Sequence, residues 1–349
     1  MRICDEGYVR QTPPLACRTG WLHKSVRTLL VVVPGLSFFV TTGDQRGVML
    51  AFAALCLSVP YGDRSFRPAH LAGCSLVAVL LTPATVWLQH YPKLYVPFIA
   101  LAGVAYTLVR RSTLLPPRMP TWVLIYVLYQ SSELRAEKWS TVSTADLLIV
   151  PAMIWVYVTC FYLWPWRGAE SVGQSSGASQ SAMTVPANAA CAALSMATAA
   201  AVTFVFNLPH PNWAVWSSLT VIRPARTVSL RRSAERLAGA VIGCALGLGA
   251  VRALNDALAM LAVITVVVVV FMVAFEQYTL AVVVRSALAP LAAFALSGDA
   301  LGAGEARFFC ILIGVTIGTT YMLILSSQWV SDVAKRLVKK IRRGEAPAG

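Results

Sequence analysis

Apolar residues fall in twelve blocks along the chain, each ended by charged residues, proline or a polar cluster. A helix rises about 1.5 Å per residue, so a span across a hydrocarbon core about 30 Å thick needs about 20 residues. Three blocks, 47–60, 120–131 and 213–223, are too short unless their flanks extend them, so we expect between ten and twelve spans. The pattern predicts an all-α fold, a polytopic transmembrane helical bundle, with blocks at 28–42, 47–60, 70–89, 94–109, 120–131, 146–165, 185–207, 213–223, 237–254, 257–275, 279–297 and 307–326.

The blocks form two groups of six on either side of a Gly/Ser-rich segment, whose composition is typical of a linker. A shift of 166 residues aligns Leu-Ala-Gly at 237–239 with Leu-Ala-Gly at 71–73. We therefore predict two tandem repeats of about six spans each. The expected domains are a cytoplasmic N-terminal tail, a first transmembrane repeat, a cytoplasmic linker, a second transmembrane repeat and a basic amphipathic C-terminal tail, at 1–27, 28–165, 166–184, 185–326 and 327–349.

Composition and charge agree with a membrane protein. Of 349 residues, 57% are hydrophobic and 13% charged, with a mean hydropathy of +0.67, whereas soluble domains carry about 25% charged residues. The net charge of +14 would suggest nucleic acid in a soluble protein, but here the cations lie at the ends of apolar blocks, so no nucleic acid partner is expected. With a cytoplasmic N-terminus, 22 basic residues fall in inner segments and six in outer ones, which predicts that both termini are cytoplasmic. Repeats of six spans then enter the membrane from the same side and are parallel.

Motifs of soluble enzyme chemistry are missing from the sequence. There is no GxxxxGK[ST] phosphate loop, no HExxH and no GxSxG, and the four histidines lie in different loops. We therefore expect a protein that is not an enzyme, with no catalytic residues, no metal site and no cofactor.

The densest chemical signal is a run of arginines followed by regularly spaced glycines. On one helix Arg232, Arg236, Gly239, Gly243 and Gly247 share a face. Glycines at this spacing let a second helix approach closely, so the arginines are expected to point into protein. Guanidinium groups there would bind carboxylates, which predicts an anionic substrate. The alternative is that they only fix the topology and reach the membrane lipids.

Arg285 lies inside an apolar block, where a charge costs about 2.5–3.5 kcal/mol. Such a residue usually faces a cavity, so we predict that it binds substrate. The alternative is a structural ion pair with a carboxylate such as Glu276, which a helix would place on the opposite side, so that Arg285 would need a partner on another helix.

The short blocks 47–60 and 213–223 hold matching places in the two halves, and each ends at a proline, Pro60 or Pro224. Interrupted segments at equivalent places often mark the binding site of a transporter. Trp213 and Trp216 would offer aromatic faces to a substrate there. The alternative for Trp213 is the aromatic belt at the membrane interface. The C-terminal tail predicts either a helix lying on an anionic leaflet or a basic tail without fixed structure.

Trp213, Pro224, the trio Arg231, Arg232 and Arg236, and the glycines at 239 and 243 together resemble the signature of the fusaric acid resistance-like (FUSC), or aromatic acid exporter, superfamily of inner-membrane proteins. The chain looks like a compact member, because a Gly/Ser linker stands where larger members carry a cytoplasmic domain. The resemblance implies a bacterial inner (plasma) membrane transporter for the gradient-driven efflux of small organic acids, especially aromatic carboxylic acids. It also implies partnership with a periplasmic membrane-fusion subunit, and a homo-oligomer is a further expectation. The alternatives are an anion channel and a structural membrane subunit of an efflux assembly without transport of its own.

Overall fold

The computed structural model describes residues 16–43, 46–58, 68–111, 119–133, 149–163, 185–208, 210–223, 225–254, 278–297 and 300–326. Within these ranges all regular structure is helical and no strand is present, which confirms the predicted all-α bundle. Six of the described helices, α1, α3, α4, α8, α10 and α13, are long and apolar enough to cross a membrane. The protein is therefore a multi-pass membrane protein.

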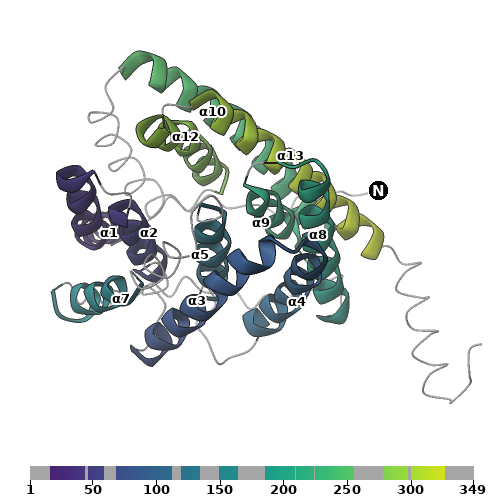
Figure 1. Ribbon diagram of the computed structural model, residues 1–349, viewed down its shortest axis with the longest axis horizontal. Helices are drawn as coiled ribbons and strands as arrows, with labels where there is room; N and C mark the ends of the chain where they lie inside the picture. Colours follow the sequence, from purple (N-terminus) through teal and green to yellow (C-terminus); the bar gives the residue numbers. More distant parts are fainter. Residues whose placement is uncertain are drawn as a thin grey trace, which may run out of the picture.

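Eleven α-helices are described, six before the linker and five after it (Figure 1). Those of the first half are α1 (Ala16–Thr42), α2 (Arg46–Ser58), α3 (Pro68–Gln89), α4 (Pro92–Arg111), α5 (Met119–Glu133) and α7 (Ile149–Val158), the last continuing as a π-helical turn, Thr159–Leu163. Those of the second half are α8 (Val185–Val205), α9 (Pro211–Val221), α10 (Arg226–Leu254), α12 (Tyr278–Ser297) and α13 (Ala300–Leu325).

The largest differences between the predicted blocks and the structure are at the starts of three helices. Helix α10 begins at Arg226 instead of 237, and α13 begins at Ala300 instead of 307. Arg307, which the charge pattern assigned to an outer loop, therefore lies within α13. Helix α1 begins at Ala16, inside the segment expected to be a tail. The apolar pattern missed these turns because small and charged residues continue each helix beyond its apolar block. The expected linker, the C-terminal tail and the block 257–275 lie outside the described residues.

Helix α9 is the centre of the second half, and nine of its eleven residues are buried. It packs against α8 and α13 of its own half and against α5 of the first half. Gly314 and Gly318 on α13 make the close approach possible, because a methyl group at either position would overlap a backbone carbonyl of α9, that of Ala214 or that of Ser218. The GxxxG pair thus brings a spanning helix onto a short, buried one.

The two halves also contact each other directly. Helix α4 packs along α8, where Gly103 lies against Ala192 and Met196. At the start of α9 the buried Asn212 accepts a hydrogen bond from the Tyr95 hydroxyl and donates one to the Leu128 carbonyl oxygen at 2.9 Å. These bonds join α9 to α4 and α5 and fix where the short helix begins.

Candidate functional site

A short buried helix positions the candidate site. His210 adopts the left-handed conformation, with φ 55°, and Pro211 opens α9. The helix ends at Val221, and Ile222 is extended, so α9 rises only about 16 Å, half of a membrane core. The chain then returns as α10, whose first turns lie beside the C-terminal half of α9.

Arg236 is the most deeply buried arginine of this region, with 3% of its surface exposed. One terminal nitrogen donates to the Tyr278 hydroxyl at 3.2 Å and the other to the Ser217 hydroxyl at 3.1 Å. Its Nε atom is buried without a hydrogen-bond partner. Arg236 thus joins α9, α10 and α12 through neutral oxygens alone.

Tyr278, the first residue of α12, lies close to three arginines, Arg232, Arg236 and Arg223. The Arg232 guanidinium lies over its ring at 4.1 Å from the ring centre. Its hydroxyl accepts from Arg236 and lies near the Thr220 hydroxyl of α9, which donates to the Ser217 carbonyl at 3.0 Å. Arg223, in the turn after α9, lies within electrostatic range of the same ring.

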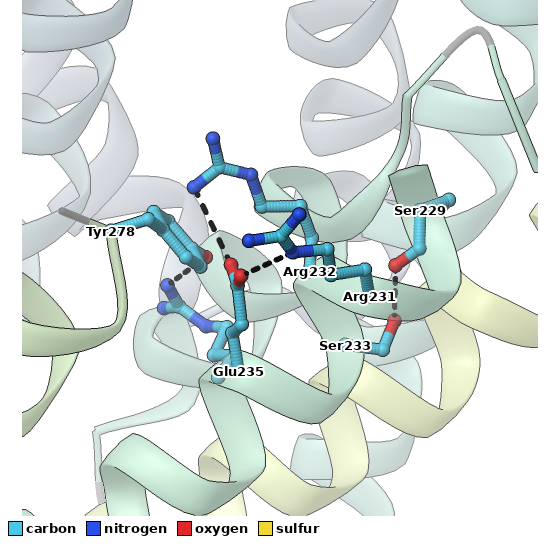
Figure 2. Close-up of polar contacts among 7 residues, drawn as sticks. Ser229, Arg231, Arg232, Ser233, Glu235 and Tyr278 are labelled. Carbon is cyan, nitrogen blue, oxygen red and sulfur yellow. Dashed lines mark hydrogen bonds and ion pairs between the residues drawn. The ribbon is translucent and has the colours of Figure 1, made fainter. Parts of the chain in front are cut away.

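Glu235 is the one carboxylate of the described residues that pairs with arginines of this region. It pairs with Arg231 and Arg232, which are more exposed than Arg236. Its oxygens lie 2.8 Å from Arg231 Nε and 3.8 Å from an Arg232 terminal nitrogen (Figure 2). The Arg231 side chain is 78% exposed, against 33% for Arg232, so this pair belongs to the surface. Glu235 leaves the buried arginines unneutralised.

Arg285 follows Tyr278 by two helical turns on α12, and its Nε atom is buried without a hydrogen-bond partner. It lies within electrostatic range of both Arg236 and Tyr278. No carboxylate of the described residues forms an ion pair with Arg236 or Arg285. We call Arg232, Arg236, Arg285 and Tyr278 the arginine cluster.

The cluster is electrostatically incomplete. Burying a charge is costly unless an opposite charge accompanies it, and two guanidinium groups near each other raise that cost. A carboxylate placed between Arg236 and Arg285 would supply the missing charge and accept hydrogen bonds from their unused N–H groups. The geometry therefore favours an organic anion as ligand.

The glycine face of α10 lies against α12, beyond the arginine cluster along the same helix. A methyl group on Gly239 would come within 2.8 Å of Val282 Cγ1. On Gly243 it would overlap the Val283 carbonyl, and on Gly247 the Ala287 carbonyl. All three glycines thus bring the two helices into contact and hold Tyr278 and Arg285 beside α10. Pro224, predicted to help packing, lies outside the described residues.

The two predicted tryptophans, Trp213 and Trp216, do not belong to the arginine cluster. Trp213 is at the start of α9, one turn before Ser217, with its ring stacked on His210 at 4.3 Å and the Arg307 guanidinium 4.7 Å from its ring centre. Burial first, and then the charge of Arg307, lower the pKa of His210, which keeps its ring neutral at pH 7. Trp216 is half-buried against the hydrophobic core around α9. The structure thus groups Arg232, Arg236 and Arg285 and separates both tryptophans from them.

Sequence reasoning missed Tyr278 and Ser217, whose neutral oxygens accept hydrogen bonds from Arg236, and Thr220, which lies beside Tyr278. Tyr278 stands at the edge of an apolar block, and Ser217 and Thr220 lie within a short one, so nothing in the local pattern distinguishes them. Only the approach of α12 to α10 and of α10 to α9 brings them to the guanidinium groups.

The described spans define a class, the multi-pass α-helical membrane proteins. Within this class, the sequence profile of the fusaric acid resistance protein-like family matches residues 197–321. The match confirms the predicted resemblance and indicates a membrane protein of transport or efflux. It covers α9, α10 and α12 and therefore the whole arginine cluster. None of the curated proteins and none of the solved structures matches the chain.

Proposed function

We propose that this protein exports small organic anions, with aromatic carboxylic acids as the expected substrates, from the bacterial cytoplasm across the inner membrane. An ion gradient drives the efflux, and the arginine cluster binds the carboxylate. The family match supports the transport class. A periplasmic membrane-fusion subunit remains the expected partner.

The single observation that carries this proposal is that Arg236 and Arg285 each have a buried Nε atom without a hydrogen-bond partner, and that no carboxylate of the described residues neutralises them. A purely topological role requires cations at the membrane surface, where water and lipid phosphates solvate them. Arg231 fits that description, being largely exposed and paired with Glu235. Arg236, with 3% exposure, does not. The difference favours ligand binding at the cluster.

Orientation is supported by a contact between the halves. Arg110, near the end of α4, lies within electrostatic range of Arg223, which precedes α10. The charge pattern assigns both segments to the inner side, so their proximity agrees with one cytoplasmic face. Reporter fusions after Arg343 and within the linker should both report cytoplasm. A periplasmic linker would contradict the orientation.

The function is tested by transport of radiolabelled benzoate in proteoliposomes with an imposed proton gradient. The proton is the first driving ion to be tested. We expect benzoate to accumulate against its own gradient, and a proton uncoupler to abolish the accumulation. Arg285→Gln should reduce the rate at least tenfold, because the substrate loses both its counter-charge and its two-pronged donor. Arg231→Gln is the matched control and should transport normally.

Two outcomes would contradict the proposal. Benzoate flux that only follows its own concentration gradient would indicate a channel. No flux under any gradient, including sodium, in correctly folded protein would indicate a structural subunit.

A further inference from the structure

Helix α3 of the first half buries a polar face. Ser75, Thr82, Thr85 and Gln89 are at most 4% exposed, and their spacing places them on one side of the helix. Leu76 and Leu80 on the other side are 61% and 62% exposed, as expected for contact with lipid. The polar side chains therefore point into the bundle.

Two of these four side chains are satisfied by their own helix. The Ser75 hydroxyl donates to the Leu71 carbonyl at 2.9 Å, and the Thr85 hydroxyl donates to the Leu81 carbonyl at 2.6 Å. Such bonds are the ordinary way in which hydroxyl groups are accommodated within a membrane helix. Ser75 and Thr85 need no further explanation.

Thr82 and Gln89 differ, because their polar atoms have no partner. The Thr82 hydroxyl oxygen and both polar atoms of the Gln89 amide are buried without a hydrogen bond. Thr82 is fully buried, and Gln89 is 2% exposed. Buried polar groups are nearly always paired, and an unpaired amide in a spanning helix is especially costly. A ligand or water that visits this face would satisfy them.

A small apolar pocket lies beside this face, and one residue that lines it is close to Arg285. Cys56 of α2 lies within electrostatic range of Arg285. Cys56 lines this pocket together with Cys74 and Ala78 of α3, and with the aromatic side chains of Trp122 and Tyr126. Thr82 lies one turn beyond Ala78 on the same face. A path from Arg285 to Thr82 would therefore pass this pocket.

The direction of this path suits export. Gln89 is the last residue of α3, about 16 Å along the helix from Ala78. The basic segment before α3, with Arg64 and Arg67, is assigned to the inner side by the charge pattern. Gln89 therefore lies toward the outer side, and the path runs outward from the cationic cluster.

We propose that Thr82 and Gln89 form a second, neutral binding site, which receives the carboxylate of the substrate after it leaves Arg285. The Gln89 amide N–H and the Thr82 hydroxyl donate hydrogen bonds to the carboxylate. A neutral site binds an anion more weakly than guanidinium groups do, so it lets the substrate leave. This inference rests on the proposed function.

The test uses Thr82→Val and Gln89→Leu in the full chain, with benzoate as the probe. Each change removes an unpaired polar group while nearly preserving the volume, so the unfolding temperature in detergent should rise. Benzoate affinity, set by the arginine cluster, should stay within twofold. Efflux from vesicles should fall at least tenfold in Gln89→Leu and severalfold in Thr82→Val.

Thr85→Val is the matched control. It makes the same chemical change on the same buried face, but its hydroxyl is already bonded to Leu81. We expect normal efflux and an unchanged or lower unfolding temperature. Gln89→Glu should also reduce efflux, because its negative charge repels the anion.

Wild-type efflux in both Thr82→Val and Gln89→Leu would overturn this site while leaving the arginine cluster in place. A lower unfolding temperature in Gln89→Leu would overturn it too, because the amide would then already have a partner. An equal loss of efflux in Thr85→Val would show that packing of α3 is the cause. If Arg285→Gln also exports normally, the failure lies in the proposed function itself.

Discussion

The Leu-Ala-Gly tripeptide at 237–239 aligns with the one at 71–73, and these two aligned copies have different surroundings. In α10 it follows Arg236, and Gly239 lies against Val282 of α12. In α3 it follows His70, and a methyl group on Gly73 would meet no atom within 4 Å. The same local sequence thus forms a tight helix contact in one half and faces open space in the other. Whether a glycine is needed for helix packing therefore depends on the neighbouring helix and not on the tripeptide itself.

The halves nevertheless pair their helices in the same way. The 166-residue shift aligns α1, α2, α3, α5 and α7 with α8, α9, α10, α12 and α13. The contacts α1–α2, α2–α7, α3–α5 and α3–α7 have counterparts in α8–α9, α9–α13, α10–α12 and α10–α13. This correspondence supports the predicted tandem repeat, which stays a prediction. Within the shared pattern, the second half gathers Arg232, Arg236 and Arg285 around Tyr278, whereas α3 of the first half buries neutral polar groups; Arg27 of α1 is a buried cation in the first half as well.

The largest expected effect comes from placing a large side chain at a glycine of α10 that contacts α12, compared with the same change at Gly73, which faces open space. Gly243→Leu should lower the free energy of unfolding by at least about 3 kcal/mol, because the side chain would overlap the Val283 carbonyl and Ser286. Gly73→Leu, which enters open space, should be nearly neutral. Thermal unfolding in detergent measures both. Equal stability of the two variants would show that α12 does not pack on α10 as described.

A smaller effect of opposite sign is expected from Arg285→Met. Replacing a partly buried cation, which no carboxylate of the described part of the chain pairs with, by an apolar side chain of similar length should raise the free energy of unfolding by about 2 kcal/mol. Benzoate transport should be lost in the same variant. A destabilised Arg285→Met protein would mean that a carboxylate already neutralises Arg285.

Tyr278→Phe removes one hydroxyl and keeps the ring under Arg232. The Arg236 nitrogen that it satisfies loses its partner, which should cost about 1 kcal/mol of stability. Tyr278→Leu also removes the ring and should cost more, because the cation–π contact is lost. Unfolding temperatures of the pair separate the two contributions, and identical values would show that the ring contact contributes nothing.

The smallest effect is expected at the surface edge of the cluster. Arg231→Ala breaks an exposed ion pair with Glu235 and should change the free energy of unfolding by less than about 0.5 kcal/mol. Raising the salt concentration should produce the same small change in the wild type. A larger loss would mean that Glu235 needs Arg231 in order to position Arg232.

These differences also show what the sequence reveals about the fold. The helical class, the apolar spans and the close approach at Gly239 and Gly243 follow from periodicity and glycine spacing, because both are properties of a single helix. The start of α13 does not follow, because Ala300 and the residues after it are too small and polar to mark a membrane block. The sequence therefore predicts a loop at Arg307, which the structure places within α13.

The candidate site could be predicted only where one helix defines it. Arg232 and Arg236 share a face of α10, so their joint position follows from the sequence. Tyr278 and Ser217 come from α12 and α9, and their contact with Arg236 depends on how three helices pack. Trp213 was grouped with the arginines because α9 immediately precedes them, but one helical turn separates it from Ser217 and directs it to His210 and Arg307.

The central claim is that buried arginines of the second half bind a carboxylate, and titration calorimetry with benzoate on purified protein tests it most directly. Arg236→Lys keeps the charge but replaces the planar donor, so we expect the dissociation constant to rise at least tenfold. Arg231→Lys, at the exposed position five residues earlier, should bind like the wild type. Equal affinities of all three proteins, with the fold intact, would contradict the account.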